Sequence, residues 1–256
     1  MGAPDFDFDA EVSWDAFLPK LALLCKLDNT LSIFANISRG YMPGGYNLFI
    51  MTPKEDTVRF EAQTSMNYEI GTKKVFNDGY MDLTLFYLDI RDVHTYKMVQ
   101  GFALTSNIPR AHSWGAETEF GYFFNENLRI DGALGFLKTE YDEHVDRSLD
   151  GNKLQNSPAY TARLGISYQQ PEGFYGRLEV RSRGDITFDD PENLKEDSYI
   201  VADLRAGYKF RNWDMYGYVN NIADKEYIYR ASIGEIKNHV MFGPGRTIGV
   251  GVRYQF

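Results

Sequence analysis

The sequence predicts an all-β protein whose antiparallel strands form a barrel that spans a membrane. Three observations support this fold class: apolar and polar residues alternate along the chain, tight turns alternate with long connections, and the composition is aromatic yet polar on average. Phe, Trp and Tyr make up 15% of the 256 residues, while the mean hydropathy is −0.41. A barrel with lipid outside and water inside combines these properties, because only one face of each strand must be apolar.

Composition also excludes several other classes of protein. The sequence contains no run of about 18 consecutive apolar residues, so no membrane-spanning helix is predicted. A net charge of −9 argues against nucleic-acid binding, which requires clustered Lys and Arg. Cys25 is the single cysteine and lies in an apolar segment, where it is expected to pack as a small residue. The first residues lack the basic and apolar regions of a secretion signal, so no signal peptide is predicted.

Alternation is clearest at the C-terminal end of the chain. One face of the last expected strand carries bulky apolar residues: Ile248, Val250, Val252, Tyr254 and Phe256. The opposite face carries small, polar or charged residues: Thr247, Gly249, Gly251, Arg253 and Gln255. The same division recurs in four earlier segments, at 114–124, 160–168, 174–183 and 198–210. Repeated charges on one face are costly in a dry core but ordinary in a wet lumen, which favours a membrane barrel over a soluble sandwich.

The expected strands follow one another with a regular pattern of connections. Strands are predicted at 12–27, 30–41, 59–76, 80–92, 105–124, 127–141, 158–169, 173–184, 198–210, 213–228 and 244–256. Short connections of turn-forming residues join them at 28–29, 77–79, 125–126, 170–172 and 211–212. Long connections alternate with these turns, at 42–58, 93–104, 142–157, 185–197 and 229–243. Outer-membrane barrels turn tightly on the periplasmic side and loop widely outside, so Phe256 is expected at the periplasmic rim.

Several segments together resemble the C-terminal barrel region of TonB-dependent receptors over nearly the whole chain. They include WDAFLPKLALLCKL at 14–27, LSIFANISRGYMPGGYN at 31–47, NYEIGTKK at 67–74, FYLDIRD at 86–92, RAHSWGAETEF at 110–120, LQNSPAYTARLGISY at 154–168, YVNNIADKEYIYRA at 218–231 and FGPGRTIGVGVRYQF at 242–256. No single segment is diagnostic, but their order and spacing are specific.

The resemblance implies a 22-stranded barrel that contains a plug and is energised by TonB. Residues 1–256, with about 11–12 strands, would then be the second half of that barrel, with the plug absent from this chain. The implied function is import of an iron-siderophore-type ligand, with vitamin B12, haem and glycans as family alternatives. The protein would perform no bond chemistry and need no cofactor. Outer-membrane lipid and the barrel assembly machinery are implied partners, the latter reading the terminal strand Ile248, Val250, Val252, Tyr254 and Phe256 as a signal.

Charged and aromatic residues provide candidates for ligand contact. Charged residues on the polar faces of neighbouring strands either guide an anionic ligand or form charge ladders that stabilise a wet wall: Arg177, Arg181, Arg183, Arg205 and Lys209, with Glu179 and Asp203. His144, His239 and Tyr229 fall in or beside long connections and are ligand-lining candidates. The four histidines could contact an iron complex, but the favoured interpretation is that they are solvated loop residues. Rim aromatics form either a lipid-interface girdle, the favoured interpretation, or a ligand-binding surface: Tyr141, Tyr227, Tyr229 and Phe242.

Metal and catalytic sites are not predicted. The alternating Asp5, Asp7 and Asp9 are interpreted as charge at a chain start rather than as a calcium site. No spacing typical of zinc ligands or of a nucleophile elbow occurs. A second functional class stays open, namely a self-contained barrel of about twelve strands that acts as a passive pore or an adhesin. The sequence upstream separates the two, since a plug and further strands would favour the receptor.

Overall fold

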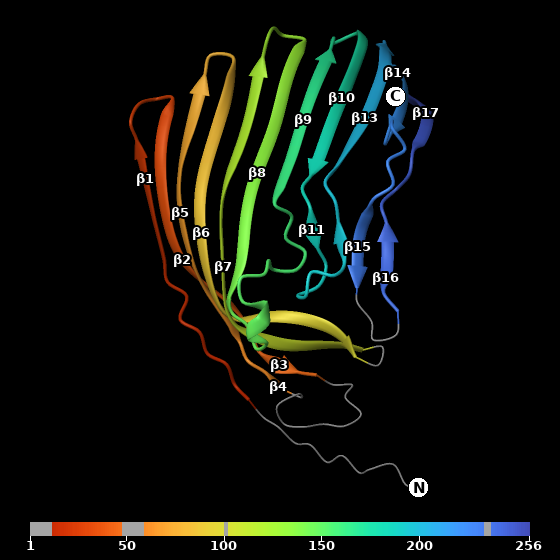
Figure 1. Ribbon diagram of the computed structural model, residues 1–256. Helices are drawn as coiled ribbons and strands as arrows, with labels where there is room; N and C mark the ends of the chain where they lie inside the picture. Colours follow the sequence, from red (N-terminus) through yellow and green to blue (C-terminus); the bar gives the residue numbers. More distant parts are fainter. Residues whose placement is uncertain (1–11, 48–58, 100–101, 233–236) are drawn as a thin grey trace.

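The computed structural model describes residues 12–47, 59–99, 102–232 and 237–256. Eleven strands form one antiparallel sheet in which each strand pairs with the next along the order (Figure 1). They are β1 (Lys20–Lys26), β2 (Leu31–Met42), β5 (Gln63–Phe76), β6 (Gly79–Val99), β7 (Phe102–Phe123), β8 (Leu128–Glu143), β9 (Tyr160–Gln169), β10 (Gly173–Arg183), β13 (Tyr199–Phe210), β14 (Trp213–Asn220) and β17 (Thr247–Tyr254). β1 and β17 are the two ends of this sheet, so the described strands do not close into a complete barrel. The predicted all-β antiparallel fold is confirmed.

Tight turns lie at one end of the sheet and long connections at the other (Figure 1). Side chains close the turns locally: the Asp28 carboxylate accepts N–H bonds from Thr30 and Leu31 at 2.6 and 2.9 Å. Such short Asx contacts make a turn without help from the rest of the fold. Asn212 accepts a bond from the Gln255 N–H at 2.9 Å, which places the C-terminal end beside a tight turn, as predicted.

The long connections form small elements of their own at the loop end. These are the pairs β3 (Gly45–Tyr46) with β4 (Arg59–Phe60), β11 (Ile186–Thr187) with β12 (Lys195–Glu196) and β15 (Ile228–Ser232) with β16 (His239–Phe242), and the short helix η1 (Arg147–Leu149). The Asp146 side chain caps η1 by accepting the Ser148 N–H at 3.0 Å. The connections are therefore built structures rather than irregular loops.

Some predicted boundaries are wrong. The connection expected at 93–104 is mostly strand, because β6 continues to Val99 and β7 resumes at Phe102. Val93 and Ile108, paired across these strands, are buried, so continued pairing covers apolar surface that an open loop would expose. The first strand begins at Lys20 rather than 12, directly after Pro19, and the strand expected at 213–228 ends at Asn220. Asp5, Asp7 and Asp9 lie outside the described residues.

The two faces of the sheet differ as the alternation predicts. On β17 the outward side chains of Ile248, Val250 and Val252 are 72%, 89% and 65% exposed, and the apolar face is open to the surroundings. Two clusters of buried apolar residues occur among the described residues, and the larger one lies near the loop end, with five members: Ile90, Val93, Ile108, Ala111 and Tyr141. None of the helices in the described part of the chain is long and apolar enough to cross a membrane.

Candidate functional site

The inward face of the wall carries an ion-pair network centred on Asp131 of β8. Arg177 of β10 donates two hydrogen bonds to its carboxylate, at 2.8 and 2.9 Å. Arg163 of β9 donates a third at 3.0 Å. Arg177 also contacts Glu179 at 2.8 Å and Ser167 at 2.7 Å. The guanidinium of Arg177 is thus neutralised by protein groups, as in a structural charge ladder.

Two further arginines of the inward face are less enclosed. Arg181 forms an ion pair with Asp203 on the neighbouring strand, and its side chain is 51% exposed. The Arg205 guanidinium lies 4.0 Å from the centre of the Tyr216 ring, in a cation–π arrangement. Arg205 and Arg177 border the same shallow hollow of about 360 Å³. Each of these two arginines thus has a partner on an adjacent strand of the wall, Asp203 for Arg181 and Tyr216 for Arg205.

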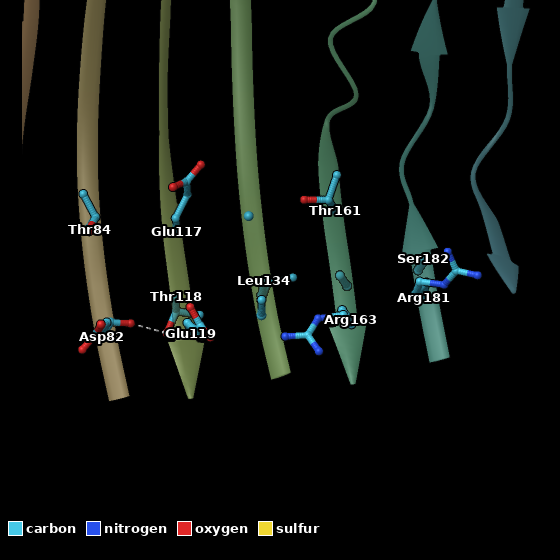
Figure 2. Close-up of a pocket in the computed structure, with 13 residues that line it drawn as sticks. Asp82, Thr84, Glu117, Thr118, Glu119, Leu134, Thr161, Arg163, Arg181 and Ser182 are labelled. Atoms are coloured by element: carbon cyan, nitrogen blue, oxygen red, sulfur yellow. Dashed lines mark hydrogen bonds between the residues drawn. The ribbon is translucent and has the colours of Figure 1, made fainter. Parts of the chain in front are cut away.

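A groove of about 540 Å³ runs along the inward wall from β6 to β10. Figure 2 shows acidic side chains at one end of this groove, on β6 and β7, and basic ones at the other, on β9 and β10. The acidic residues are Asp82, Glu117 and Glu119, and the basic residues are Arg163 and Arg181. The groove therefore carries negative charge at one end and positive charge at the other. This arrangement does not form a continuous positively charged path for an anion.

A larger cavity of about 1000 Å³ lies at the loop end, enclosed by the connections. Its lining combines an apolar floor with polar groups, the usual composition of a ligand pocket. Ile186, Phe188 and Ala231 form the floor and pack as a small core of their own. The polar lining includes His144, Arg183, Asp190, Tyr229 and Arg230. The strands β11 and β15, below the long strands on the right of Figure 1, contribute Ile186 and Ala231 to this lining.

His144 presents an unpartnered donor to this cavity. Its Nδ1 accepts the Asp146 backbone N–H at 2.9 Å, so the proton of the neutral ring is on Nε2. The side chain is 10% exposed, and Nε2 lies 3.8 Å from the nearest Asp190 carboxylate oxygen, which is too far for a hydrogen bond. No other residue that the structure describes forms a hydrogen bond with Nε2. Asp190 itself is held in place by the Tyr141 hydroxyl at 2.6 Å.

Arg183 provides a second donor in the same cavity. Its Nη2 donates to the Ile228 carbonyl at 2.8 Å, and the guanidinium lies 4.9 Å from the Tyr199 ring centre. These contacts fix the orientation of the group, yet its buried Nε–H has no partner among the described residues. A buried donor without an acceptor costs about 1–3 kcal/mol, and an oxygen-rich ligand would recover that cost. The cavity is thus arranged to receive hydrogen-bond acceptors.

Ion pairs hold together the two connections that enclose the cavity. Lys153 donates to Asp185 at 2.7 Å, and its backbone N–H donates to Glu192 at 3.0 Å. Lys195 donates to the same Glu192 at 2.8 Å. The hydrogen bond from Lys153 lowers the pKa of Asp185, and that from Lys195 lowers the pKa of Glu192. Both carboxylates are therefore ionised at neutral pH and bridge the segments around the cavity.

The structure divides the predicted site residues between two regions. His144 and Tyr229 share the cavity, whereas Arg177, Arg181 and Arg205 line the wall. His239 on β16 is exposed and is not among the described cavity-lining residues. The interpretation of the histidines as solvated is wrong for His144, because Tyr141 and Asp190 cover it. No group of three or more His, Cys, Asp or Glu suited to a metal ion occurs in the described ranges.

The rim aromatics also divide. Tyr141 is not a girdle residue, since it is 2% exposed within the loop-end core, whereas Phe242 is 65% exposed. Arg183, Asp190 and Arg230 were not predicted to share one site with His144. These residues are far apart in the sequence, so no local pattern indicates that they lie close together in the fold. The only local signal was that Arg183 ends a strand on its polar face, next to a long connection.

Outward apolar strands, an inward charged face and a loop-end cavity define a β-barrel wall of the outer-membrane type. A family model described as "TonB dependent receptor-like, beta-barrel" matches residues 3–222. The chain therefore belongs to the TonB-dependent receptor β-barrel family, and it is an outer-membrane protein.

Named relatives and a solved structure agree with this membership. The chain is 26% identical over 246 residues to the pesticin receptor of Yersinia enterocolitica, covering 94% of this chain and 36% of that protein. It is 27% identical over 250 residues to the metal-pseudopaline receptor CntO of Pseudomonas aeruginosa, covering 93% and 33%. The ferric yersiniabactin uptake receptor FyuA from Yersinia pestis superposes with a TM-score of 0.81 at 25% identity, covering 93% of this chain and 37% of that one. The chain spans about a third of the length of these relatives.

Proposed function

We propose that this chain forms part of the wall and ligand-binding mouth of an active-transport receptor for an iron-siderophore-type ligand. Similar proteins are named as receptors for ferric yersiniabactin, metal-pseudopaline and rhizobactin, all of which are uptake or receptor proteins rather than enzymes. TonB would energise the transport, as the family name implies. In this mechanism the protein binds and releases its ligand without breaking a covalent bond in it.

The loop-end cavity is the observation that carries the proposal. Metal chelates of this kind present oxygen acceptors on a partly apolar framework. The apolar floor of Ile186 and Phe188 would contact the framework, and the free N–H groups of His144 and Arg183 would bind its oxygens. Tyr229, 59% exposed at the cavity, would supply a further aromatic contact. The volume of about 1000 Å³ is within the upper range of small-molecule sites.

The wall arginines have a different proposed role. Arg177 is saturated by Asp131, Glu179 and Ser167, which supports structural stabilisation of the lumen face. Arg181 and Arg205 are each engaged by a neighbouring strand, through Asp203 and Tyr216 respectively. We assign all three to the wall and not to direct ligand capture. His239, exposed on β16, would reach a ligand only at the outermost rim.

The sheet also supports a place for this chain within a larger barrel. The free edges of β1 and β17 carry backbone groups that lipid cannot satisfy, at a cost of several kcal/mol for each group. Further strands would remove this cost by pairing with both edges, and a plug would fill the lumen. The outward row of Ile248, Val250, Val252, Tyr254 and Phe256 suits contact with lipid and with the barrel assembly machinery.

An uptake assay tests the proposed transport. Cells without their own ferric-siderophore receptors would produce the whole receptor and be offered radioactive iron on a panel of siderophores. Saturable uptake of one of these chelates, abolished by deletion of TonB, is expected. Uptake that is unsaturable and persists without TonB would contradict the proposal and support the passive pore. Adhesion to cells or surfaces without any uptake would support the adhesin.

A further inference from the structure

The outward face of the wall changes character in one step near the loop end. One row across β2, β5, β6, β7 and β8 is apolar and aromatic over four of its five positions: Ile37, Tyr68, Tyr87, Trp114 and Lys138. The next row toward the loops is mostly charged: Arg39, Met66, Asp89, His112 and Glu140. Aromatic residues of membrane barrels gather where lipid tails meet headgroups. The charged row therefore lies at the level of the lipid headgroups.

A shallow pocket of about 320 Å³ opens at this level, between β2 and β6. Its lining residues are Arg39, Thr64, Ser65, Met66, Asp89 and Arg91. Thr64 and Met66 pair in register with Arg91 and Asp89, which places the two arginines on either side of β5. In the part of the chain that the structure describes, neither guanidinium forms an ion pair or a side-chain hydrogen bond.

The neighbouring carboxylates do not compensate these two arginines. Asp89 accepts a hydrogen bond from Arg110 at 3.0 Å. Asp142 contacts His112 at 2.7 Å, and Glu140 forms an ion pair with Lys138 at 3.4 Å. Each described acid on this patch therefore already has a basic partner. The guanidinium groups of Arg39 and Arg91 are left without a described carboxylate partner.

The position of Arg91 adds a second reason to expect an anion. It lies directly opposite Arg110 in the β6–β7 pairing, and like charges in this arrangement destabilise a sheet. Arg110 is held by Asp89 and Asp142, while Arg91 has no such support. An anion bound between Arg39 and Arg91 would relieve this repulsion.

We propose that this pocket binds the phosphate group of a lipid in the outer leaflet of the outer membrane. Guanidinium groups bind phosphate oxygens through paired hydrogen bonds, and basic pockets at headgroup level are typical lipid-phosphate sites. The Thr64 hydroxyl, at the pocket between the two arginines, can donate a further hydrogen bond. The lipid tails would then run along Ile37 and Tyr68, in the apolar row below. The site faces away from the loop-end cavity and is independent of the transported ligand.

Native mass spectrometry of the whole receptor in detergent tests this site, with lipid A as the phosphate-bearing probe. The double variant R39Q/R91Q is expected to retain lipid A at least about tenfold less than the unmodified receptor, since two charge-assisted contacts are lost. The matched control is K138Q, which removes a cation of the same outward face that is outside the pocket and already paired. This control should retain lipid A normally. Unfolding temperatures of both variants establish that the barrel is folded.

Three outcomes would overturn the proposal. Equal retention of lipid A by R39Q/R91Q would mean that the arginines do not bind it. Equal retention of a phosphate-free glycolipid with the same tails would mean that the tails alone hold the lipid. Displacement of lipid A by millimolar inorganic phosphate would identify a free-anion site instead. If R39Q/R91Q failed to fold, the single variants R39Q and R91Q would be measured, and unchanged retention by both would count against the site.

Discussion

Two arginines on the same face of β10 show how differently the wall and the mouth are built. Arg177 is surrounded by acceptors and donates to Asp131, Glu179 and Ser167. Arg183, six residues further along the strand, is oriented by Ile228 and Tyr199, but its buried Nε–H has no partner within the described ranges. The two residues have the same chemistry and the same position in the alternating pattern.

The difference comes from the strands on either side. Arg177 lies near Asp131, which reaches it from β8, two strands away, across Gly165. Arg183 pairs with Thr161 on β9 and Tyr199 on β13, and neither of these residues carries a carboxylate that could form an ion pair with it. Register therefore decides whether an inward arginine stabilises the wall or remains available for a ligand. Four experiments test this contrast between wall and mouth.

Removal of the acid at the centre of the wall network should have the largest effect. The Asp131 side chain is only 7% exposed and forms ion pairs with Arg129, Arg163 and Arg177. The substitution Asp131→Ala removes this carboxylate and leaves three positive charges close together. We expect the free energy of unfolding to fall by about 3 kcal/mol, measured by urea unfolding of the receptor in detergent. The control Glu117→Gln alters a carboxylate of the same wall that forms no described ion pair. A loss below about 1 kcal/mol for Asp131→Ala would mean that the network contributes little.

Ligand affinity should distinguish the mouth from the wall. We expect Arg183→Gln to weaken binding of the transported chelate about tenfold or more, because a charge-assisted hydrogen bond is lost. His144→Phe should act in the same direction, since it removes the Nε2 donor and keeps an aromatic ring. Titration of the chelate by intrinsic fluorescence measures both. Arg181→Gln is the wall control, and an equal loss of affinity in that variant would mean that the wall arginines also guide the ligand.

Acid should loosen the mouth before the wall. The pKa values of Asp185 and Glu192 are lowered in the folded protein, so their contribution to stability is complete above their unfolded values and is lost as pH falls through the folded ones. Below about pH 4 we expect faster hydrogen exchange in 153–155 and 192–196, by less than about tenfold because these pairs are solvent-screened. The substitution Lys153→Met should produce the same change at neutral pH. Exchange that is unaffected by acid would contradict the bridging role.

The smallest effect is expected from the exposed wall pair. Arg181→Ala removes the contact with Asp203, but water already screens the Arg181 side chain, which is 51% exposed. The free energy of unfolding should fall by less than about 1 kcal/mol, in the same urea assay. A loss of stability as large as that of Asp131→Ala would show that burial does not explain the difference in stability between the two ion pairs.

Most of the strand plan could be predicted because its signals are local. Alternation along β17 and β10 identified both faces, and the turns at Asp28 and Asn125 are closed by side chains two or three residues away. The connection at 93–104 was predicted wrongly for the opposite reason. Val93 and Ile108 stay in strands because they pack in one buried cluster with Tyr141, which is remote from both in the sequence. The shared cavity of His144 and Arg183 depends on contacts of the same long-range kind.

The sequence by itself determined the class of fold, the strand order, the two environments of the wall and the resemblance to TonB-dependent receptors. Each of these follows from period-two patterning, turn chemistry or segment order, which are properties of neighbouring residues. Only the tertiary structure decided which charges are paired and which are free. Partners such as Asp131 for Arg177, and the missing partner of Arg91, depend on register between strands and on how the connections fold back over the sheet.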